Sequence, residues 1–555
     1  MECLMKFKRK NNLKAINIFL ICMFLFSCSK NQTKPLKESA NEENQKNQNQ
    51  VIENHADSVT VSDSDGEKEA LENEEEPQKP KDTQVNDKKD DDNNVKDNDE
   101  DSNSDQSAPI LSLAVILEKL ENLNFSELLE ENEELNLSSE LIEVSNALWQ
   151  KYLRAVNEDG NRKSQHENRA ITYGNSTMRF SLDTIGQMPE SGYSAFIALH
   201  GGGGAPPPLN DSQWEQMKIY YKSSVDNGVY IAPRGISNTY NLHFMPDSYP
   251  LYDRMIENLI AYENVNPNKI FILGFSAGGD GVYQIAPRMP DRWAGANMSA
   301  GHSNGVSLIN VFNTPFLIQM GEMDTAYNRH TVAAQNYLNI QGFDQQWPGY
   351  KYEIFLHKGG SHNSWRDNDP LARPQEVILD PQLWLNENNR EATMSNTNAI
   401  QWLSQYERNP VPEVITWDLA TFANRPMSYG EKLLAKEEHK NLLSPLDSLN
   451  AWVAILETDE RSTGFLQIRM SDSENTIEIE SIKSVRSLRI LLAQQHFDFE
   501  KPVSLFVEGT LVDKILAKPN LSTMTRSLLE RGDPSYIFHA EINLVQDGES
   551  WKISL

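Results

Sequence analysis

The run Gly274-Phe275-Ser276-Ala277-Gly278-Gly279 constrains the fold of this chain more than any other stretch. It follows the apolar residues 270–273, which predict a short buried strand, and it precedes residues 281–286, which are compatible with a helix. A serine in a G-x-S-x-G pattern between a strand and a helix lies on a sharp turn, where larger neighbouring side chains would collide with both elements. The pattern therefore predicts an exposed serine oxygen, followed by an amide that can stabilise an oxyanion.

Segments with strand and helix character alternate on both sides of this turn. The alternation predicts a mainly parallel sheet covered by helices on both faces, with active residues at the carboxyl ends of its strands. We therefore expect an α/β domain over residues 161–411. The predicted strands are residues 170–173, 178–182, 195–199, 229–232, 270–273, 295–299, 316–320 and 352–356, and the other predicted helices are residues 214–221, 251–262, 331–338 and 399–406.

The remaining sequence predicts further parts, because 555 residues are enough for two or three domains. Residues 110–160 carry leucines at helical spacing, and they predict a helical segment. This segment either packs on the α/β domain or forms a small module of its own. Residues 412–555 contain several segments with strand character and one helical segment near 521–529, so we expect a β-rich accessory domain there.

The N-terminus has the features of an export signal. A basic start precedes the apolar residues 15–26, a run too short for a comfortable transmembrane helix but suited to a secretory signal. The run ends in Leu25-Phe26-Ser27-Cys28, which resembles the bacterial lipobox and implies cleavage before Cys28 and lipidation of that residue. The alternatives are an uncleaved anchor and an ordinary signal peptide. No cysteine follows Cys28, so the mature chain cannot form an internal disulfide.

Residues 29–109 differ in composition from the rest of the chain. They contain no Phe, Trp or Tyr and are rich in acidic residues, Asn, Gln and Ser. Such a segment cannot bury enough apolar surface to offset chain entropy, so it predicts a disordered acidic tether. Much of the formal net charge of −29 lies here, and this charge argues against a nucleic-acid partner.

An acid and a histidine follow two strands of the predicted sheet. Residues 316–320 lead into a loop that holds Asp324, and residues 352–356 lead into a loop that holds His362 after two glycines. Both loops lie at the same end of the sheet as Ser276. A serine nucleophile needs a base that takes its proton and an acid that orients the base, so these three residues predict a catalytic set.

Each of these two residues has rivals. Glu322 is the alternative acid, but Asp324 lies farther into the loop and has the shorter side chain. His357 falls at the end of a predicted strand, and His330 precedes a predicted helix. The position of His362 after two glycines favours it over both.

A glycine loop follows another predicted strand. The sequence His200-Gly201-Gly202-Gly203-Gly204 comes directly after residues 195–199. Glycines allow backbone amides to point at a developing negative oxygen, so the loop predicts an oxyanion hole. A phosphate-binding loop is the competing interpretation, but the lysine and hydroxyl residue of a P-loop are missing. The amides of Gly202 (or Gly201) and Ala277 are the predicted donors.

Together these motifs are similar to those of the α/β-hydrolase superfamily. The set is H-G-G-G-G, G-F-S-A-G-G-D-G, G-x-x-D and G-G-x-H-x-x-W, and the chain order of serine, acid and histidine agrees with that superfamily. More narrowly, residues 166–407 resemble secreted hydrolases related to polyhydroxybutyrate depolymerases and to feruloyl and acetylxylan esterases. The run Glu530-Arg531-Gly532-Asp533-Pro534 is similar to a tail on some exported bacterial hydrolases. The chain departs from the secreted depolymerases and feruloyl esterases by lacking their disulfides.

The resemblance implies a serine hydrolase that cleaves carboxylic esters through an acyl-enzyme, with no metal or cofactor. The expected substrate is an ester, one linked to a polysaccharide or a polyester among the options. Two alternatives remain: a serine peptidase of the prolyl-oligopeptidase type, and a non-catalytic surface lipoprotein that serves adhesion. The lipid on Cys28 predicts a location in the bacterial cell envelope. The outer membrane or cell surface is favoured because Ser29 is not the aspartate that retains some lipoproteins in the inner membrane.

Overall fold

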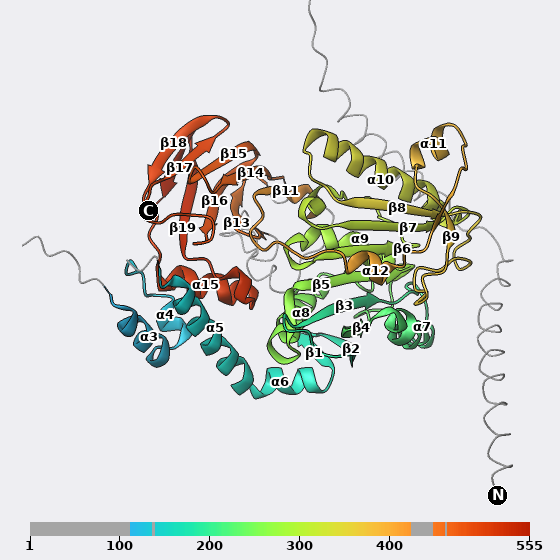
Figure 1. The fold of residues 1–555 in the computed structure, drawn as a ribbon, viewed down its shortest axis with the longest axis horizontal. Helices are drawn as coiled ribbons and strands as arrows, with labels where there is room; N and C mark the ends of the chain where they lie inside the picture. The colour runs from blue at the N-terminus through green and yellow to red at the C-terminus, as the bar shows by residue number, and fades with distance from the viewer. Residues whose placement is uncertain (1–110, 136–138, 423–447, 461–462, 555) are drawn as a thin grey trace, which may run out of the picture. The chain divides into compact units, whose positions relative to one another are not determined.

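The computed structural model describes residues 111–135, 139–422, 448–460 and 463–554 (Figure 1). The predicted lipidation site Cys28 and the predicted tether 29–109 lie outside these residues. The described residues all belong to one compact unit. In the described ranges, no helix has both the length and the apolar character needed to cross a membrane.

A ten-stranded mixed sheet forms the centre of the α/β part (Figure 1). Its spatial order is β1-β2-β4-β3-β5-β6-β7-β8-β9-β10. Strands β3 to β8 run parallel, whereas β1, β2, β9 and β10 pair in antiparallel fashion at the two sides. The strands are β1 (Ala170–Tyr173), β2 (Ser176–Ile185), β3 (Tyr193–Leu199), β4 (Gly228–Pro233), β5 (Val265–Phe275), β6 (Gly295–Ser299), β7 (Phe316–Gly321), β8 (Tyr352–His357), β9 (Gln375–Ile378) and β10 (Thr393–Ser395).

Helices cover both faces of this sheet, as predicted. Along β3, Ala195, Ile197 and Leu199 belong to one hydrophobic cluster, and the alternate residues Phe196 and Ala198 belong to another. The first cluster includes side chains of α8, α9 and α10, and the second includes side chains of α7 and α12. The helices are α7 (Pro207–Tyr220), α8 (Ser248–Tyr262), α9 (Ala277–Ile285), α10 (Arg329–Gln346), α11 (Pro381–Asn386) and α12 (Ala399–Leu403).

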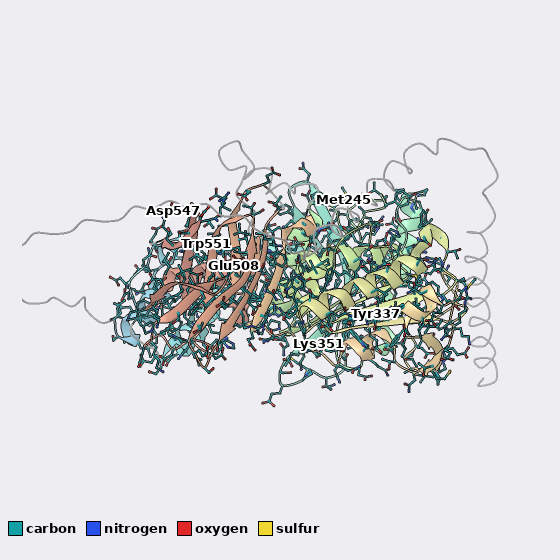
Figure 2. All side chains as sticks on the ribbon, turned by 90° about the horizontal axis from the view of Figure 1, so that it is seen from above. Met245, Tyr337, Lys351, Glu508, Asp547 and Trp551 are labelled. Atoms are coloured by element: carbon teal, nitrogen blue, oxygen red, sulfur yellow. The ribbon has the colours of Figure 1, made fainter. Side chains whose placement is uncertain are left out.

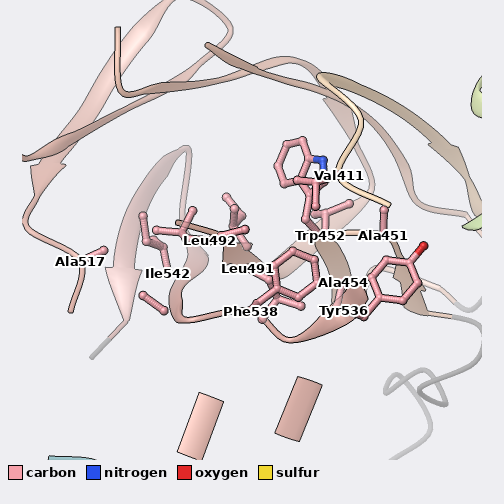
Figure 3. Close-up of a cluster of buried hydrophobic side chains, with 14 of the residues drawn as sticks. Val411, Ala451, Trp452, Ala454, Leu491, Leu492, Ala517, Tyr536, Phe538 and Ile542 are labelled. Carbon is pink, nitrogen blue, oxygen red and sulfur yellow. The ribbon is translucent and has the colours of Figure 1, made fainter. Parts of the chain in front are cut away.

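The C-terminal part consists of two five-stranded sheets that share one hydrophobic cluster, part of which Figure 3 shows around Trp452, Leu491 and Phe538. Figure 2 labels Tyr337 on α10 and Trp551 on β20, one in each part of the chain. One sheet contains β11 (Val414–Asp418), β14 (Phe465–Ser471), β15 (Thr476–Lys483), β17 (Val503–Val507) and β18 (Thr510–Ile515). The other contains β12 (Leu449–Asn450), β13 (Val453–Thr458), β16 (Val485–Leu492), β19 (Ala540–Asp547) and β20 (Ser550–Ser554).

The helical segment near residues 110–160 packs on the C-terminal sheets. Ile116 and Leu148 belong to the same hydrophobic cluster as Leu528 of α15 (Leu521–Arg531). The amide of Leu135 also donates a hydrogen bond to the carbonyl of Pro519, at 2.7 Å. The helices are α3 (Leu113–Asn122), α4 (Phe125–Leu128), α5 (Leu141–Glu158) and α6 (Gly160–Glu167). Most of this segment therefore follows neither alternative that the sequence left open, because it packs on the C-terminal part.

A buried ionic cluster joins the C-terminal tail motif to the α/β part. Arg531 forms an ion pair with Asp291 at 2.5 Å, and Asp533 forms one with Arg408 at 2.7 Å. All four side chains are nearly inaccessible to solvent. Between them, Gly532 has a φ of +56°, and a Cβ there would lie 2.5 Å from the Tyr152 hydroxyl. The motif 530–534 is therefore a docking element between parts that are far apart in sequence.

Candidate active site

Ser276 lies on the predicted sharp turn between β5 and α9. Its backbone has φ 59° and ψ −122°, and its amide donates to the Ser299 carbonyl at 2.9 Å. A Cβ on Gly274 would lie 2.3 Å from the Gly278 carbonyl oxygen, and one on Gly278 would lie 2.0 Å from the Leu199 carbonyl oxygen. Only glycine fits at these two places, which explains the residue pattern around the serine.

The structure brings Ser276, His362 and Asp324 together in one hydrogen-bonded series. The Ser276 Oγ lies 3.0 Å from His362 Nε2, and His362 Nδ1 lies 2.6 Å from Asp324 Oδ2. Asp324 follows β7, and His362 follows β8, so both loops emerge at the carboxyl ends of neighbouring parallel strands. The Asp324 side chain is almost fully buried, while the His362 side chain is 30% exposed. The histidine is thus oriented by the acid and partly open to solvent.

The rival acid, Glu322, has a different position. Its Oε2 accepts a hydrogen bond from the Gly359 amide at 2.7 Å, and its Oε1 forms an ion pair with Arg390 at 3.1 Å. The Trp384 indole nitrogen also donates to Oε1 at 3.3 Å. Glu322 therefore ties down the loop that leads to His362 and is not the partner of the imidazole.

The rival histidines are also placed elsewhere. His357 is buried, with Nε2 3.1 Å from the Gln319 amide oxygen, and burial lowers its pKa to about 3. The His330 ring packs edge-on against Trp384, with ring centroids 5.5 Å apart. Burial lowers the pKa of His330 as well.

The glycine loop after β3 lies next to Ser276. A Cβ on Gly201 would be 3.4 Å from the Ser276 Cβ, and Gly202 and Gly203 have φ values of +106° and +79°. The Gly203 amide donates to the Asn210 side-chain oxygen at 2.8 Å, so this amide is already engaged. Within the described residues, the amides of Gly201, Gly202 and Ala277 have no hydrogen-bond acceptor. These are the donors that the sequence predicts for an oxyanion.

Two residues that support this loop carry no clear signal of that role in the sequence. Asn210 lies in α7, and it also donates to the Ala205 carbonyl at 2.9 Å. His200 is fully buried, with Nδ1 2.6 Å from the Gly201 carbonyl and Nε2 accepting the Gly235 amide at 3.1 Å. Burial lowers the pKa of His200 to about 4, so its neutral form donates from Nδ1 and accepts at Nε2.

The aromatic and histidine residues of the surrounding loops divide into three groups. Tyr240 is 72% exposed, and its ring occupies the space that a side chain on Gly204 would fill, so it lies at the rim of the glycine loop. Trp365 stacks on His357 beneath the site, with ring centroids 4.2 Å apart. Three other residues lie outside the site or among the residues that support it. Trp347 packs on Phe465, His243 is buried with its Nε2 2.8 Å from the His200 carbonyl oxygen, and the His302 amide donates to Asp280.

Comparison with known proteins gives matches among solved structures. No protein-family model and no curated protein matches the chain. A thermostable esterase is 18% identical, with 43% of this chain and 63% of that chain covered and a TM-score of 0.30. A phospholipase/carboxylesterase from Dyadobacter fermentans is 14% identical, with 36% and 95% covered and a TM-score of 0.26. A protein from Bacteroides ovatus described as a dipeptidyl aminopeptidase IV is 16% identical, with 36% and 33% covered and a TM-score of 0.28.

The fold class follows from the topology of the chain itself. The sheet has the order β1-β2-β4-β3-β5-β6-β7-β8 in its first eight strands, with β2 antiparallel to its neighbours. The serine turn lies directly after β5, and the acid and histidine loops follow β7 and β8. This chain therefore has the α/β-hydrolase fold, extended by two strands beyond β8 and by a C-terminal β-rich part.

Proposed function

We propose that this protein is a serine hydrolase that cleaves carboxylic esters by way of an acyl-enzyme. The observation that carries the proposal is the hydrogen-bonded series from Ser276 through His362 to Asp324, at 3.0 Å and 2.6 Å. A serine hydroxyl is a weak nucleophile unless a base within hydrogen-bond reach takes its proton. The buried carboxylate of Asp324 holds the imidazole in the tautomer that presents Nε2 to the serine.

The reaction proceeds in two halves. In the first, Ser276 Oγ attacks the ester carbonyl while its proton moves to His362 Nε2, and the tetrahedral intermediate then expels the alcohol, which takes that proton. In the second, His362 removes a proton from water, the hydroxide oxygen attacks the acyl carbon, and the acid leaves as Ser276 regains its proton. Asp324 stabilises the positive imidazolium that forms in each half.

The oxyanion of each tetrahedral intermediate is bound by backbone amides. We assign this role to Ala277 and to Gly202 or Gly201, because their amides have no acceptor within the described residues and flank the serine. Amides that are already oriented in the resting enzyme need no reorganisation when the charge develops. The alternative of a prolyl-oligopeptidase-type peptidase is less favoured, because such an enzyme normally carries a propeller or another gating domain. The described sheets form no propeller, and the His362 side chain is 30% exposed.

The setting of the activity is part of the proposal. We place the enzyme in the bacterial cell envelope, attached through a lipid on Cys28, with the outer membrane or cell surface favoured. The proposed substrates are esters borne by a polysaccharide or a polyester, and a nucleic-acid partner is not proposed because the chain is strongly acidic.

The proposal is tested by hydrolysis of p-nitrophenyl acetate, butyrate and octanoate by the full chain beside its S276A variant. Turnover that disappears in S276A supports a serine esterase, and the trend with acyl length reports the depth of the acyl pocket. Cleavage of aminoacyl-proline substrates without ester cleavage supports the peptidase alternative. Failure of a fluorophosphonate probe to label Ser276 supports the adhesion alternative.

A further inference from the structure

A buried carboxylate outside the catalytic series lies under the nucleophile turn. Asp367, in the loop between β8 and β9, is fully inaccessible to solvent. Its carboxylate accepts hydrogen bonds from the hydroxyls of Tyr220 at 2.9 Å, Tyr221 at 2.5 Å and Ser299. All three of these donors are neutral hydroxyls. A carboxylate buried in this way is costly unless its oxygens are hydrogen-bonded, so the three donors are held firmly around it.

A line of buried side chains on β6, β7 and β8 ends at this carboxylate. Each member donates to the next, in the direction of Asp367. His357 Nε2 donates to Gln319, Gln319 donates to Asn297 at 3.0 Å, Asn297 donates to Ser299 at 3.0 Å, and Ser299 donates to Asp367. Burial lowers the pKa of His357 to about 3, so its neutral ring has one N–H to give. Because every group in this series donates toward Asp367, the last group in the series must be an acceptor. A carboxylate without a proton meets that requirement.

Two short routes connect Asp367 with the proposed catalytic residues. Ser299, whose hydroxyl is held by Asp367, uses its carbonyl to accept the Ser276 amide at 2.9 Å. Tyr220, also held by Asp367, packs on Phe275 with ring centroids 5.8 Å apart, and the Phe275 ring lies 5.6 Å from the His362 ring. The same carboxylate thus fixes one support of the serine and one support of the histidine.

We propose that Asp367 is a positioning residue that holds the Ser276 turn and the His362 ring in their reactive arrangement, acting through Ser299 and Tyr220. This inference rests on the proposed function. Burial raises the pKa of Asp367, and the hydrogen bonds from Ser299, Tyr221 and Tyr220 oppose that effect. Catalytic groups reach their productive geometry only when neighbouring residues lock them in place, so loosening this anchor slows the reaction without removing a reacting group.

Substitution of Asp367 changes the positions of its donors. In D367N, one oxygen is replaced by an NH₂ group that faces hydroxyl hydrogens, so at least one donor must turn away. Ser299 and Tyr220 then lose the fixed partner that sets their position. Asp367 does not contact the described catalytic atoms, so the expected effect is on kcat and on serine reactivity, with KM nearly unchanged.

The experiment compares D367N, Y220F and S299A with the wild-type full chain, because Tyr220 and Ser299 are the residues through which Asp367 is proposed to act. The readouts are the second-order rate of labelling of Ser276 by a fluorophosphonate, kcat and KM for p-nitrophenyl butyrate, and the Tm. The matched control is Y350F, which removes another buried tyrosine hydroxyl, one that donates to the Ile309 carbonyl at 2.6 Å. Tyr350 precedes Lys351 (labelled in Figure 2) at the amino end of β8, the end opposite to the site.

We expect the labelling rate and kcat to fall about tenfold in D367N, Y220F and S299A, with KM within about twofold, and both rates to be unchanged in Y350F at a similar loss of Tm. Unchanged rates in D367N, or in both Y220F and S299A, overturn the proposal, as does an equal loss in Y350F. If D367N does not fold, Y220F and S299A decide. A wild-type chain that is labelled but cleaves no ester refutes the esterase function alone, because the labelling rates still test Asp367. A wild-type chain that is not labelled overturns both.

Discussion

The two acids at the end of β7 offer the sharpest test of the proposed mechanism. Asp324 contacts the imidazole, whereas Glu322, two residues earlier, holds the backbone of the loop that carries it. We expect D324N to lose activity far out of proportion to its loss of stability, and E322Q to lose stability while it keeps its activity. The two substitutions are chemically alike and remove one charge each, so each is the control for the other.

The loss of activity in D324N follows from the tautomer of His362. Asp324 Oδ2 accepts the Nδ1 proton at 2.6 Å, which leaves Nε2 free to take the serine proton. An asparagine can present its NH₂ group to Nδ1 and so favour the opposite tautomer. Losing the orienting acid of such a triad lowers kcat by a factor on the order of 10⁴, equivalent to about 5.5 kcal/mol of transition-state stabilisation.

The loss of stability in E322Q follows from three donors around one buried carboxylate. They are the Gly359 amide at 2.7 Å, the Trp384 indole nitrogen at 3.3 Å and Arg390 at 3.1 Å. A glutamine retains one accepting oxygen and turns its NH₂ group toward a donor, which costs about 1–3 kcal/mol of unfolding free energy. The Arg390 side chain is half exposed, so its ion pair adds little to that figure.

The assay measures kcat and KM for p-nitrophenyl butyrate, together with urea unfolding of both variants. Equal activity of D324N and the wild type would show that Asp324 does not orient the base. A loss of kcat in E322Q as large as that in D324N would return Glu322 to the role of catalytic acid. Fluorophosphonate labelling of each variant separates a slow serine from a misfolded chain.

Three further predictions concern the turn, the ionic cluster and pH. We expect G278A to abolish serine labelling, because its Cβ would lie 2.0 Å from the Leu199 carbonyl oxygen; normal labelling would contradict the turn geometry. We expect D533N to lower the free energy of unfolding, measured with urea, by about 3–5 kcal/mol, because the buried Arg408 loses its partner. A decrease of less than about 1 kcal/mol would refute this prediction. Burial lowers the pKa of several histidines below 6.5. At a pH below 6.5 the unfolded chain therefore binds protons that the folded chain does not bind. We expect the free energy of unfolding to decrease as the pH is lowered from about 6.5 toward 4, by up to about 1.4 kcal/mol per pH unit for each histidine. Flat unfolding free energies from pH 7 to 5 would contradict it. These histidines are His200, His243, His357 and His539.

Local sequence predicted the centre of the fold well, for a physical reason. Strands buried on both faces are short apolar runs, and β5, β7 and β8 each contain one directly before a turn or loop. The chemistry of the loops then follows from their position, since parallel neighbours deliver them to one edge. The juxtaposition of Ser276, His362 and Asp324 was therefore accessible from spacing and residue type.

The edge of the sheet beyond β8 was not predicted, because its signals are weak. β10 covers only Thr393–Ser395 and has no buried residue, and β9 covers four residues. Helix α7 begins at Pro207, seven residues before the predicted start at residue 214, although proline at the first helical position is a recognised start signal. Helix α10 runs to Gln346, eight residues beyond the predicted end, through a largely polar stretch that gives little periodicity. Tertiary contacts decide such elements more than the local pattern does.

The role of the tail motif 530–534 lay beyond any local argument. Its charged residues suggest a solvated surface, yet Arg531 and Asp533 are buried against Asp291 and Arg408, more than a hundred residues away in the chain. A charge is buried at tolerable cost only when its partner is buried with it, so neither part of the chain can satisfy these groups alone. Removing residues 412–555 would leave Arg408 without its carboxylate and would also uncover the apolar side of the neighbouring helices. The C-terminal part is therefore a component of the same folded unit, and we expect the proposed catalytic site to depend on it for stability even though it supplies none of the three triad residues.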